Sequence, residues 1–247
     1  MLLTFLYIFL VVLVAGLLQA TTGFGFALIT TPLLIFVMNP IDVVIFNFII
    51  STVILTVMVY QTFSKGDMKE IKVLLGTSIA GTILGTYVIS RINDDILKIF
   101  IGVVLILVTL TMNLKIDMKL GANNLARSCA GFVSGFLGAT TSLGGPPVIL
   151  FMMSQKEDKD FIRANLACFF FLGNLITLSL FFLSGNLHFM HMSTYLLVAI
   201  PAVLIGYVLG NKMFSSINSA SFNKISSGVV LLGAVTTLFN GVLQLLK

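Results

Sequence analysis

The sequence has few charged residues, two cysteines and two histidines in a chain of 247 residues. Charged side chains make up 9% of it, whereas an average soluble domain carries about 25%. This low charge argues against an ordinary soluble domain. Cys129 and Cys168 both fall in apolar segments and form no CxxC or Cys/His cluster. We therefore expect buried free thiols and no metal site.

Patterns typical of several function classes are also missing. There is no HExxH motif, the apolar segments contain no acid–base pair, and the first acidic residue, Asp42, lies at a segment edge. A membrane-embedded enzyme therefore has no support, and we expect no catalytic residue and no cofactor. The net charge of +5 comes from bases in short loops rather than from a basic stripe, so nucleic acid is not an expected partner.

Long runs without charge make up most of the chain. A helix crosses a bilayer with roughly 20 apolar residues, and these runs are continuous rather than alternating as in a β-barrel. We predict an all-α polytopic membrane protein. The first run has no basic region and exceeds the apolar part of a signal peptide, so we expect it to be retained. The charge-free runs are 1–41, 43–64, 73–90, 99–114, 128–155, 164–211 and 225–246.

Glycines, prolines and charged loops divide these runs into ten apolar segments. Two are too short for a bilayer core of about 30 Å: at 1.5 Å per residue, 24–38 would span roughly 22 Å and 146–154 roughly 14 Å. Both adjoin a polar, glycine-rich interruption, so we predict broken or re-entrant half-helices within 15–38 and 128–154. The segments are 2–20, 24–38, 43–62, 73–90, 96–114, 125–139, 146–154, 164–184, 193–211 and 225–245.

The two interruptions resemble each other. "AGLLQATTGFG" at 15–25 and "SGFLGATTSLG" at 134–144 match at six of eleven positions with a constant offset of 119. Asn47 and Asn165 correspond at an offset of 118. We infer two homologous halves with a joining segment: a first transmembrane repeat at 1–114, a cytoplasmic linker at 115–124 and a second transmembrane repeat at 125–247.

Lysine and arginine positions test how each interruption is arranged. If each broken unit is a hairpin that returns to its starting side, eleven bases share one side and three the other. If each broken unit instead crosses the membrane once, the lysines and arginines other than Lys247 divide six against seven between the two sides. Cytoplasmic loops carry an excess of Lys and Arg, which favours hairpins, with both termini on the non-cytoplasmic side of the cell membrane. Five segments per half is an odd number, so the two repeats must be inverted.

Interrupted helices also predict a binding site. Backbone that leaves the helix inside a membrane must line a cavity or be buried in protein, and inverted-repeat transporters bind substrate at such breaks near the midplane. Each break here precedes a half-helix whose N-terminus exposes N–H groups and partial positive charge. Glycines permit close approach and hydroxyls add donors. The predicted substrate-binding residues are Gln19, Thr21, Thr22, Gly23, Gly25, Asn47, Thr140, Thr141, Ser142, Gly144, Gly145 and Asn165.

Helix packing is the alternative for the same residues, because small residues let membrane helices approach closely. A single motif would favour packing, whereas two matched motifs beside short segments favour a site. Asn47 and Asn165 stay open between ligand contact and helix bridging. Three glycine pairs inside helices are interpreted as packing contacts: Gly81/Gly85, Gly131/Gly135 and Gly206/Gly210.

With these motifs the chain resembles the sulfite exporter TauE/SafE family, also called the toluene sulfonate uptake permease family. The resemblance rests on "QATTGFGFALITTPLL" and "LGATTSLGGPPVIL" and covers essentially the whole chain. It implies transport of sulfite, sulfonates or related organosulfur anions, with the family motif falling on Gln19 to Gly25 and Gly138 to Pro147. Phe26 stands where the second repeat has Gly145, so the second motif is the closer match.

The leading hypothesis is a membrane transporter of a small sulfur-containing anion: sulfite, a sulfonate, or a related organosulfur carboxylate or oxyanion. It would work by alternating access around a midplane site. The alternative is a passive anion channel or a membrane scaffold without a transport cycle. The apolar segments hold no carboxylate that would indicate a proton relay, so coupling to a proton or to Na⁺ stays open. Substrate identity, direction of transport and oligomeric state stay open as well.

Overall fold

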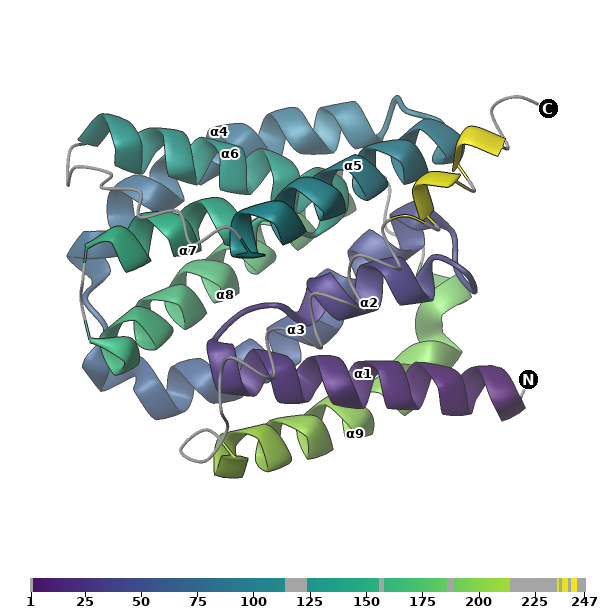
Figure 1. Ribbon diagram of the computed structural model, residues 1–247, viewed down its shortest axis with the longest axis horizontal. Helices are drawn as coiled ribbons and strands as arrows, with labels where there is room; N and C mark the ends of the chain where they lie inside the picture. The colour runs from purple at the N-terminus through teal and green to yellow at the C-terminus, as the bar shows by residue number, and fades with distance from the viewer. Residues whose placement is uncertain are drawn as a thin grey trace.

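The computed structural model describes residues 2–113, 124–155, 158–185, 189–213, 235, 237–239 and 241–243. This part of the chain is helical, with short connections between helices (Figure 1). The predicted linker lies almost wholly outside the described residues, as does most of the tenth predicted segment. The elements are α1 (Leu2–Thr22), α2 (Phe26–Leu34), α3 (Pro40–Thr62), η1 (Phe63–Lys65), α4 (Met68–Ile89), α5 (Asp94–Asn113), α6 (Asn124–Thr141), α7 (Gly145–Ser154), α8 (Lys159–Leu183) and α9 (Phe189–Met213).

The helices begin where the sequence supplies caps. Pro40 occupies the first turn of α3, where its missing N–H costs nothing. The carboxylates of Asp67 and Asp158 accept hydrogen bonds from the first turns of α4 and α8, at Lys69 N and Asp160 N. Such N-caps satisfy donors that have no partner within the helix. Charged loops thus mark the ends of the apolar segments.

In the described part of the chain, five helices are long and apolar enough to cross a membrane, which agrees with a polytopic membrane protein. The short elements are also as predicted: α2 has nine residues and α7 has ten, or roughly 14 and 15 Å of helix. Neither spans a bilayer core of about 30 Å. The candidate spans are Leu2–Thr22, Pro40–Lys65, Ile71–Ile89, Asp160–Leu183 and Met192–Lys212.

Each short helix folds back along the helix before it. The hydroxyl of Tyr7, early in α1, donates to the carbonyl of Leu33, at the end of α2, over 2.8 Å. In the second pair, the guanidinium of Arg127, early in α6, lies 5.6 Å from the ring centroid of Phe151, late in α7. In both pairs the beginning of the long helix contacts the end of the short one. The chain therefore reverses direction at each break.

The same packing contact is made twice, by α4 on α6 and by α9 on α1. Figure 1 shows these pairs along opposite edges of the molecule, with α2, α3, α7 and α8 between them. Glycine in α4 or α9 lets the backbone of the partner helix approach closely. This confirms that the glycine pairs Gly81/Gly85 and Gly206/Gly210 are packing contacts. The contacted residues correspond in the two halves: Leu13 and Leu17 of α1 are related to Phe132 and Phe136 of α6 by the offset of 119. An added Cβ at Gly81 would meet the backbones of Phe132 and Phe136, and one at Gly206 would meet those of Leu13 and Leu17.

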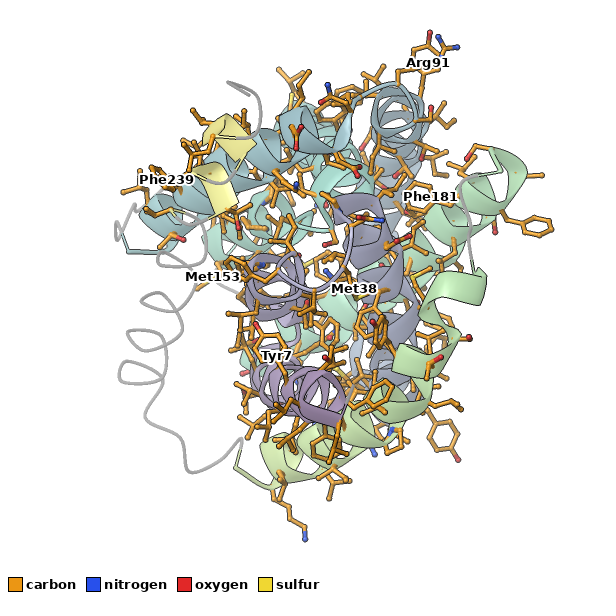
Figure 2. The ribbon with its side chains drawn as sticks, turned by 90° about the vertical axis from the view of Figure 1, so that its right-hand side faces the viewer. Tyr7, Met38, Arg91, Met153, Phe181 and Phe239 are labelled. Carbon is orange, nitrogen blue, oxygen red and sulfur yellow. The ribbon has the colours of Figure 1, made fainter. Side chains whose placement is uncertain are left out.

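Apolar side chains cover the outside of the molecule as well as its core (Figure 2). Leu2, Leu183 and Leu197 are more than 70% exposed, which is expected of helices that face lipid rather than water. Cys168 is buried as predicted, but Cys129 is exposed. The prediction for Cys129 was wrong because an apolar segment in a membrane protein also has an outer face.

Candidate functional site

Paired threonines end the helix before each break. The hydroxyls of Thr21 and Thr22 donate to carbonyls of α1, among them Leu18 O at 2.8 Å from each hydroxyl. Thr140 and Thr141 make the equivalent bonds in α6, and Thr141 donates to Leu137 O over 2.7 Å. The hydroxyls of Thr22 and Thr141 also accept from the backbone N–H two residues later. These hydroxyls thus satisfy backbone groups at a helix terminus.

The residue after each threonine pair has left-handed backbone geometry. Gly23 has φ of 84° and Ser142 has φ of 60°. The N–H of Gly23 donates to Gln19 O over 2.8 Å, and that of Ser142 donates to Gly138 O over 2.7 Å. Glycine adopts this conformation without strain, whereas serine carries a steric cost. The two breaks therefore share one backbone design.

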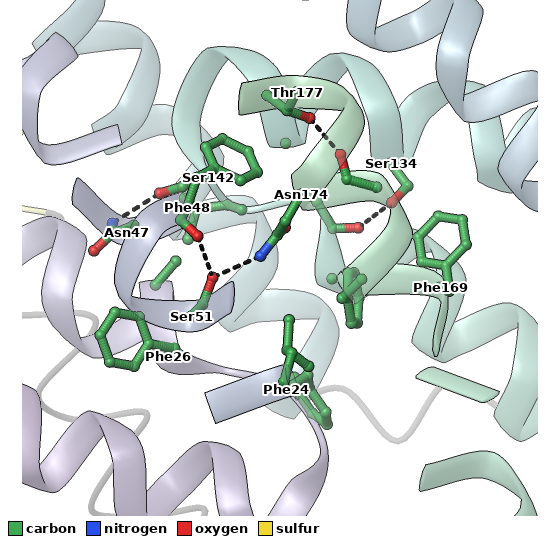
Figure 3. A pocket seen from close by; sticks show the side chains of 18 of the residues that line it. Phe24, Phe26, Asn47, Phe48, Ser51, Ser134, Ser142, Phe169, Asn174 and Thr177 are labelled. Atoms are coloured by element: carbon green, nitrogen blue, oxygen red, sulfur yellow. Dashed lines mark hydrogen bonds between the residues drawn. The ribbon is translucent and has the colours of Figure 1, made fainter. Parts of the chain in front are cut away.

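Both breaks open onto one cavity of about 90 Å³ (Figure 3). The beginning of α2 contributes Phe24 to Leu28, and the beginning of α7 contributes Ser142 to Pro146. The middle parts of α3, α4, α6 and α8, together with Gln19 of α1, complete the wall. Aromatic rings, glycines, hydroxyls and amides line it, and none of its lining residues is charged.

A hydrogen-bonded cluster joins the second break to α2 and α3. The amide nitrogen of Asn47 donates to Thr31 Oγ1 and to Ser142 Oγ, both over 2.9 Å. The two hydroxyl oxygens lie 3.0 Å apart, and Ser142 donates to Thr141 O over 2.6 Å. Asn47 therefore bridges segments from both halves of the sequence at the wall of the cavity.

A second hydrogen-bonded cluster, centred on the amide of Asn174, also lies in the cavity wall. Asn174 in α8 donates to Ser51 Oγ over 2.8 Å and to Thr52 Oγ1 over 3.3 Å. Ser134 in α6 donates to the carbonyl of Gly144 and so anchors the second break (Figure 3). Ser51, Thr52 and Ser134 were missed by the sequence analysis, and Asn174 was only a weaker candidate because the side it faces was unknown. The available signal was a polar side chain inside an apolar segment, which tends to face the protein interior.

The two half-helix N-termini differ in their donors. The start of α2 leaves N–H groups at Gly25, Phe26 and Ala27 outside the helical pattern, while Leu28 N bonds to Gly25 O over 3.1 Å. At the start of α7, Pro146 and Pro147 remove two N–H groups. The start of α2 therefore keeps more backbone N–H donors than the start of α7.

Gln19 is a buried polar side chain in the same cavity wall. It is 3% exposed, and among the described residues no donor reaches its Oε1. The Oδ1 of Asn47 is likewise buried without a donor in the described part of the chain. Buried polar groups of native proteins are nearly always paired, so these two oxygens distinguish the cavity from ordinary helix packing.

Six of the twelve predicted binding residues line the cavity: Gln19, Gly25, Asn47, Ser142, Gly144 and Gly145. The other six are not in its lining: Thr21, Thr22, Gly23, Thr140, Thr141 and Asn165. The four threonines bond to their own helix ends, as described above. The Oδ1 of Asn165 accepts from Asp67 N over 2.8 Å, so this side chain ties α8 to the start of α4. Asn47 and Asn165 correspond in sequence but make different contacts.

Metal ligands are not clustered in the described residues, where no group of three or more His, Cys, Asp or Glu side chains is placed to hold an ion. Fold and cavity together define a polytopic membrane protein with a small cavity at two helix breaks. The chain belongs to the sulfite exporter TauE/SafE family, whose model matches residues 8–237. It is therefore a membrane transport protein of the sulfite-exporter type. No curated protein and no solved structure matches the chain.

Proposed function

We propose that the protein moves sulfite, or a similarly small sulfur-containing anion such as a sulfonate, by alternating access around this cavity. The observation that carries the proposal is the meeting of both helix breaks at one uncharged cavity. Backbone N–H groups at a helix N-terminus bind anions without a lysine or arginine. The volume of about 90 Å³ favours a compact oxyanion over a large aromatic sulfonate.

The two halves, 1–114 and 125–247, act as inverted repeats in this proposal. Equivalent contacts of α1 with α9 and of α6 with α4 support it, as does the chain reversal at each break. Helices α2 and α7 are then re-entrant half-helices whose N-terminal ends meet near the membrane midplane. Rocking of one repeat against the other would expose the cavity to the two sides in turn.

We also propose that both termini face the non-cytoplasmic side. Phe5, near the beginning of α1, makes an edge-to-face ring contact with Tyr195 near the beginning of α9. Gly241 packs against Asp95 at the beginning of α5. The opposite end holds the Lys65–Asp160 ion pair and belongs to the base-rich side, which would be cytoplasmic. Reporters fused to each terminus test this orientation in cells.

Flux of labelled sulfite into proteoliposomes tests the proposed function. The intact protein should show saturable uptake that accelerates when unlabelled sulfite is present on the far side, because an alternating-access carrier exchanges substrate. A channel would give uptake without this exchange, and a scaffold would give none above empty liposomes. Either result would overturn the proposed transport cycle.

A further inference from the structure

Gln19 carries hydrogen-bonding capacity that no described part of the protein satisfies. It lies in the last turn of α1 and in the cavity wall, and it is 3% exposed. No described donor reaches its Oε1. A carboxamide both donates and accepts, and rotation of its terminal torsion is broad and soft. The side chain therefore has both an acceptor and a donor with which to meet a ligand in the cavity.

Asn47 provides a second buried acceptor in the same wall. Its amide nitrogen is fixed by two hydroxyl oxygens, Thr31 Oγ1 and Ser142 Oγ, each at 2.9 Å. The Ser142 hydroxyl is committed to Thr141 O at 2.6 Å, so Ser142 Oγ is left as an acceptor for the amide. The network thus sets the orientation of the amide. The remaining atom, Asn47 Oδ1, has no donor among the described residues, and the residue is 1% exposed.

Two acceptors without donors are an unfavourable environment for an anion that has only acceptor oxygens. The α2 N-terminus supplies partial positive charge, but the cavity lining holds no full positive charge to balance a dianion. A singly charged oxyanion that still carries a proton suits both the unpaired acceptor oxygens and the absence of a full positive charge in the cavity lining. It offers acceptor oxygens to the N–H groups and a hydrogen to the amide oxygens.

We propose that the cavity selects the protonated, singly charged form of its oxyanion, hydrogensulfite, and that Gln19 contacts its hydrogen. Gln19 Oε1 accepts from the ligand O–H while Nε2 donates to another ligand oxygen. The inference rests on the proposed function and adds the protonation state of the substrate. Gly138 occupies the equivalent position of the second half and has no side chain, so this recognition comes from the first half alone. The ligand carries its own proton, which removes the need for an intramembrane carboxylate.

Calorimetric titration of the purified full chain with sodium sulfite across neutral pH tests the proposal. Sulfite gains its first proton near neutrality, so hydrogensulfite is the minor species in alkaline solution. The apparent Kd should be constant in the acidic range and rise about tenfold per pH unit in the alkaline range. Methanesulfonate, a monoanion with no hydrogen to donate, should bind more weakly and without this pH dependence.

Gln19→Met, which keeps the length of the side chain, should weaken sulfite binding in the acidic range by on the order of tenfold to a hundredfold. It should change methanesulfonate binding much less. Gln61→Met is the matched control, because Gln61 lies at the end of α3 and not in the cavity wall. Gln19→Glu, of nearly equal size, provides a second variant, and its loss of affinity should grow as pH rises and the carboxylate ionises.

Sulfite binding that is independent of pH would overturn the inference, as would wild-type affinity in both Gln19 variants. A requirement for Na⁺ without pH dependence would assign the two amide oxygens to a cation and also overturn it. In these cases sulfite still binds and the proposed function stands. Failure of both sulfite and methanesulfonate to bind the folded protein would instead contradict the proposed function together with the inference.

Discussion

The first helix break, residues 19–28, and the second, residues 138–147, have nearly the same backbone hydrogen bonds but different side chains at the cavity. Gln19 in the first break corresponds to Gly138 in the second. The start of α2, which keeps its N–H donors, corresponds to the start of α7, which contains two prolines. The threonine pairs and the chain reversal are common to both. The shared features build the break, and the unshared ones give the cavity its chemistry.

The matched glycines at the third position after the threonines serve different purposes. Gly25 has φ of 97°, a conformation that suits glycine. Gly144 has an ordinary φ of −71°, but an added Cβ would lie 2.5 Å from Ser134 O. Glycine is therefore required at the first break mainly for its backbone conformation and at the second for space. Identical motif letters do not imply identical physical roles.

Gly144→Ala should give the largest effect and is the most direct way to disrupt the second break alone. The new methyl would collide with the backbone oxygen of Ser134, and overpacking of this kind costs about 1–3 kcal/mol. Gly138→Ala is the control, because its Cβ would lie 3.7 Å from Gly144 Cα, an ordinary contact. Thermal unfolding in detergent measures both. Equal midpoints for the two variants would show that the second break relaxes freely.

Substitutions of Ser142 separate backbone strain from hydrogen bonding. Ser142→Ala loses the bonds to Asn47 and Thr141 but keeps a Cβ at φ of 60°. Ser142→Gly loses the same bonds and relieves the strain, so it should be more stable than Ser142→Ala by about 1 kcal/mol. Chemical denaturation of both variants measures the difference. A less stable glycine variant would mean that the left-handed conformation is not strained.

Thr22→Val and Thr141→Val should have matching effects, because the two hydroxyls make equivalent bonds. Each change removes a hydroxyl that donates to a helix carbonyl and accepts from a backbone N–H. We expect a loss of about 0.5–1.5 kcal/mol in stability for each, with little direct change in anion affinity. Unfolding and titration experiments on both variants test this. A selective loss of affinity in one variant would assign its hydroxyl to the ligand.

Pro147→Ala should give the smallest effect and make the two half-helix N-termini more alike. It restores an N–H near the start of α7, where an added donor favours an anion by about 0.3–1 kcal/mol. Sulfite affinity should therefore rise by a few-fold. Unchanged affinity, with the helix intact by circular dichroism, would indicate that the anion is bound by the first half only.

The sequence alone determined the class of fold and the position of the breaks. Charge-free runs predicted membrane helices, and the lengths of 24–38 and 146–154 predicted short elements that became α2 and α7. The repeated motif located both breaks, because a helix that stops inside an apolar run needs specific residues to end it. Family membership also followed from these motifs.

Tertiary structure decided which polar side chains reach the cavity. The sequence could not show that the threonine hydroxyls bond to their own helices, because a hydroxyl's partner depends on its rotamer and on nearby carbonyls. It also could not distinguish Asn47, in the cavity wall, from Asn165, which lies in α8 and binds Asp67 N before α4, because equal positions in two repeats meet different neighbours. Gln19 was one residue among twelve in the sequence. Its significance comes from burial without a described donor for its Oε1, a property that only the packing of seven helices around one cavity creates.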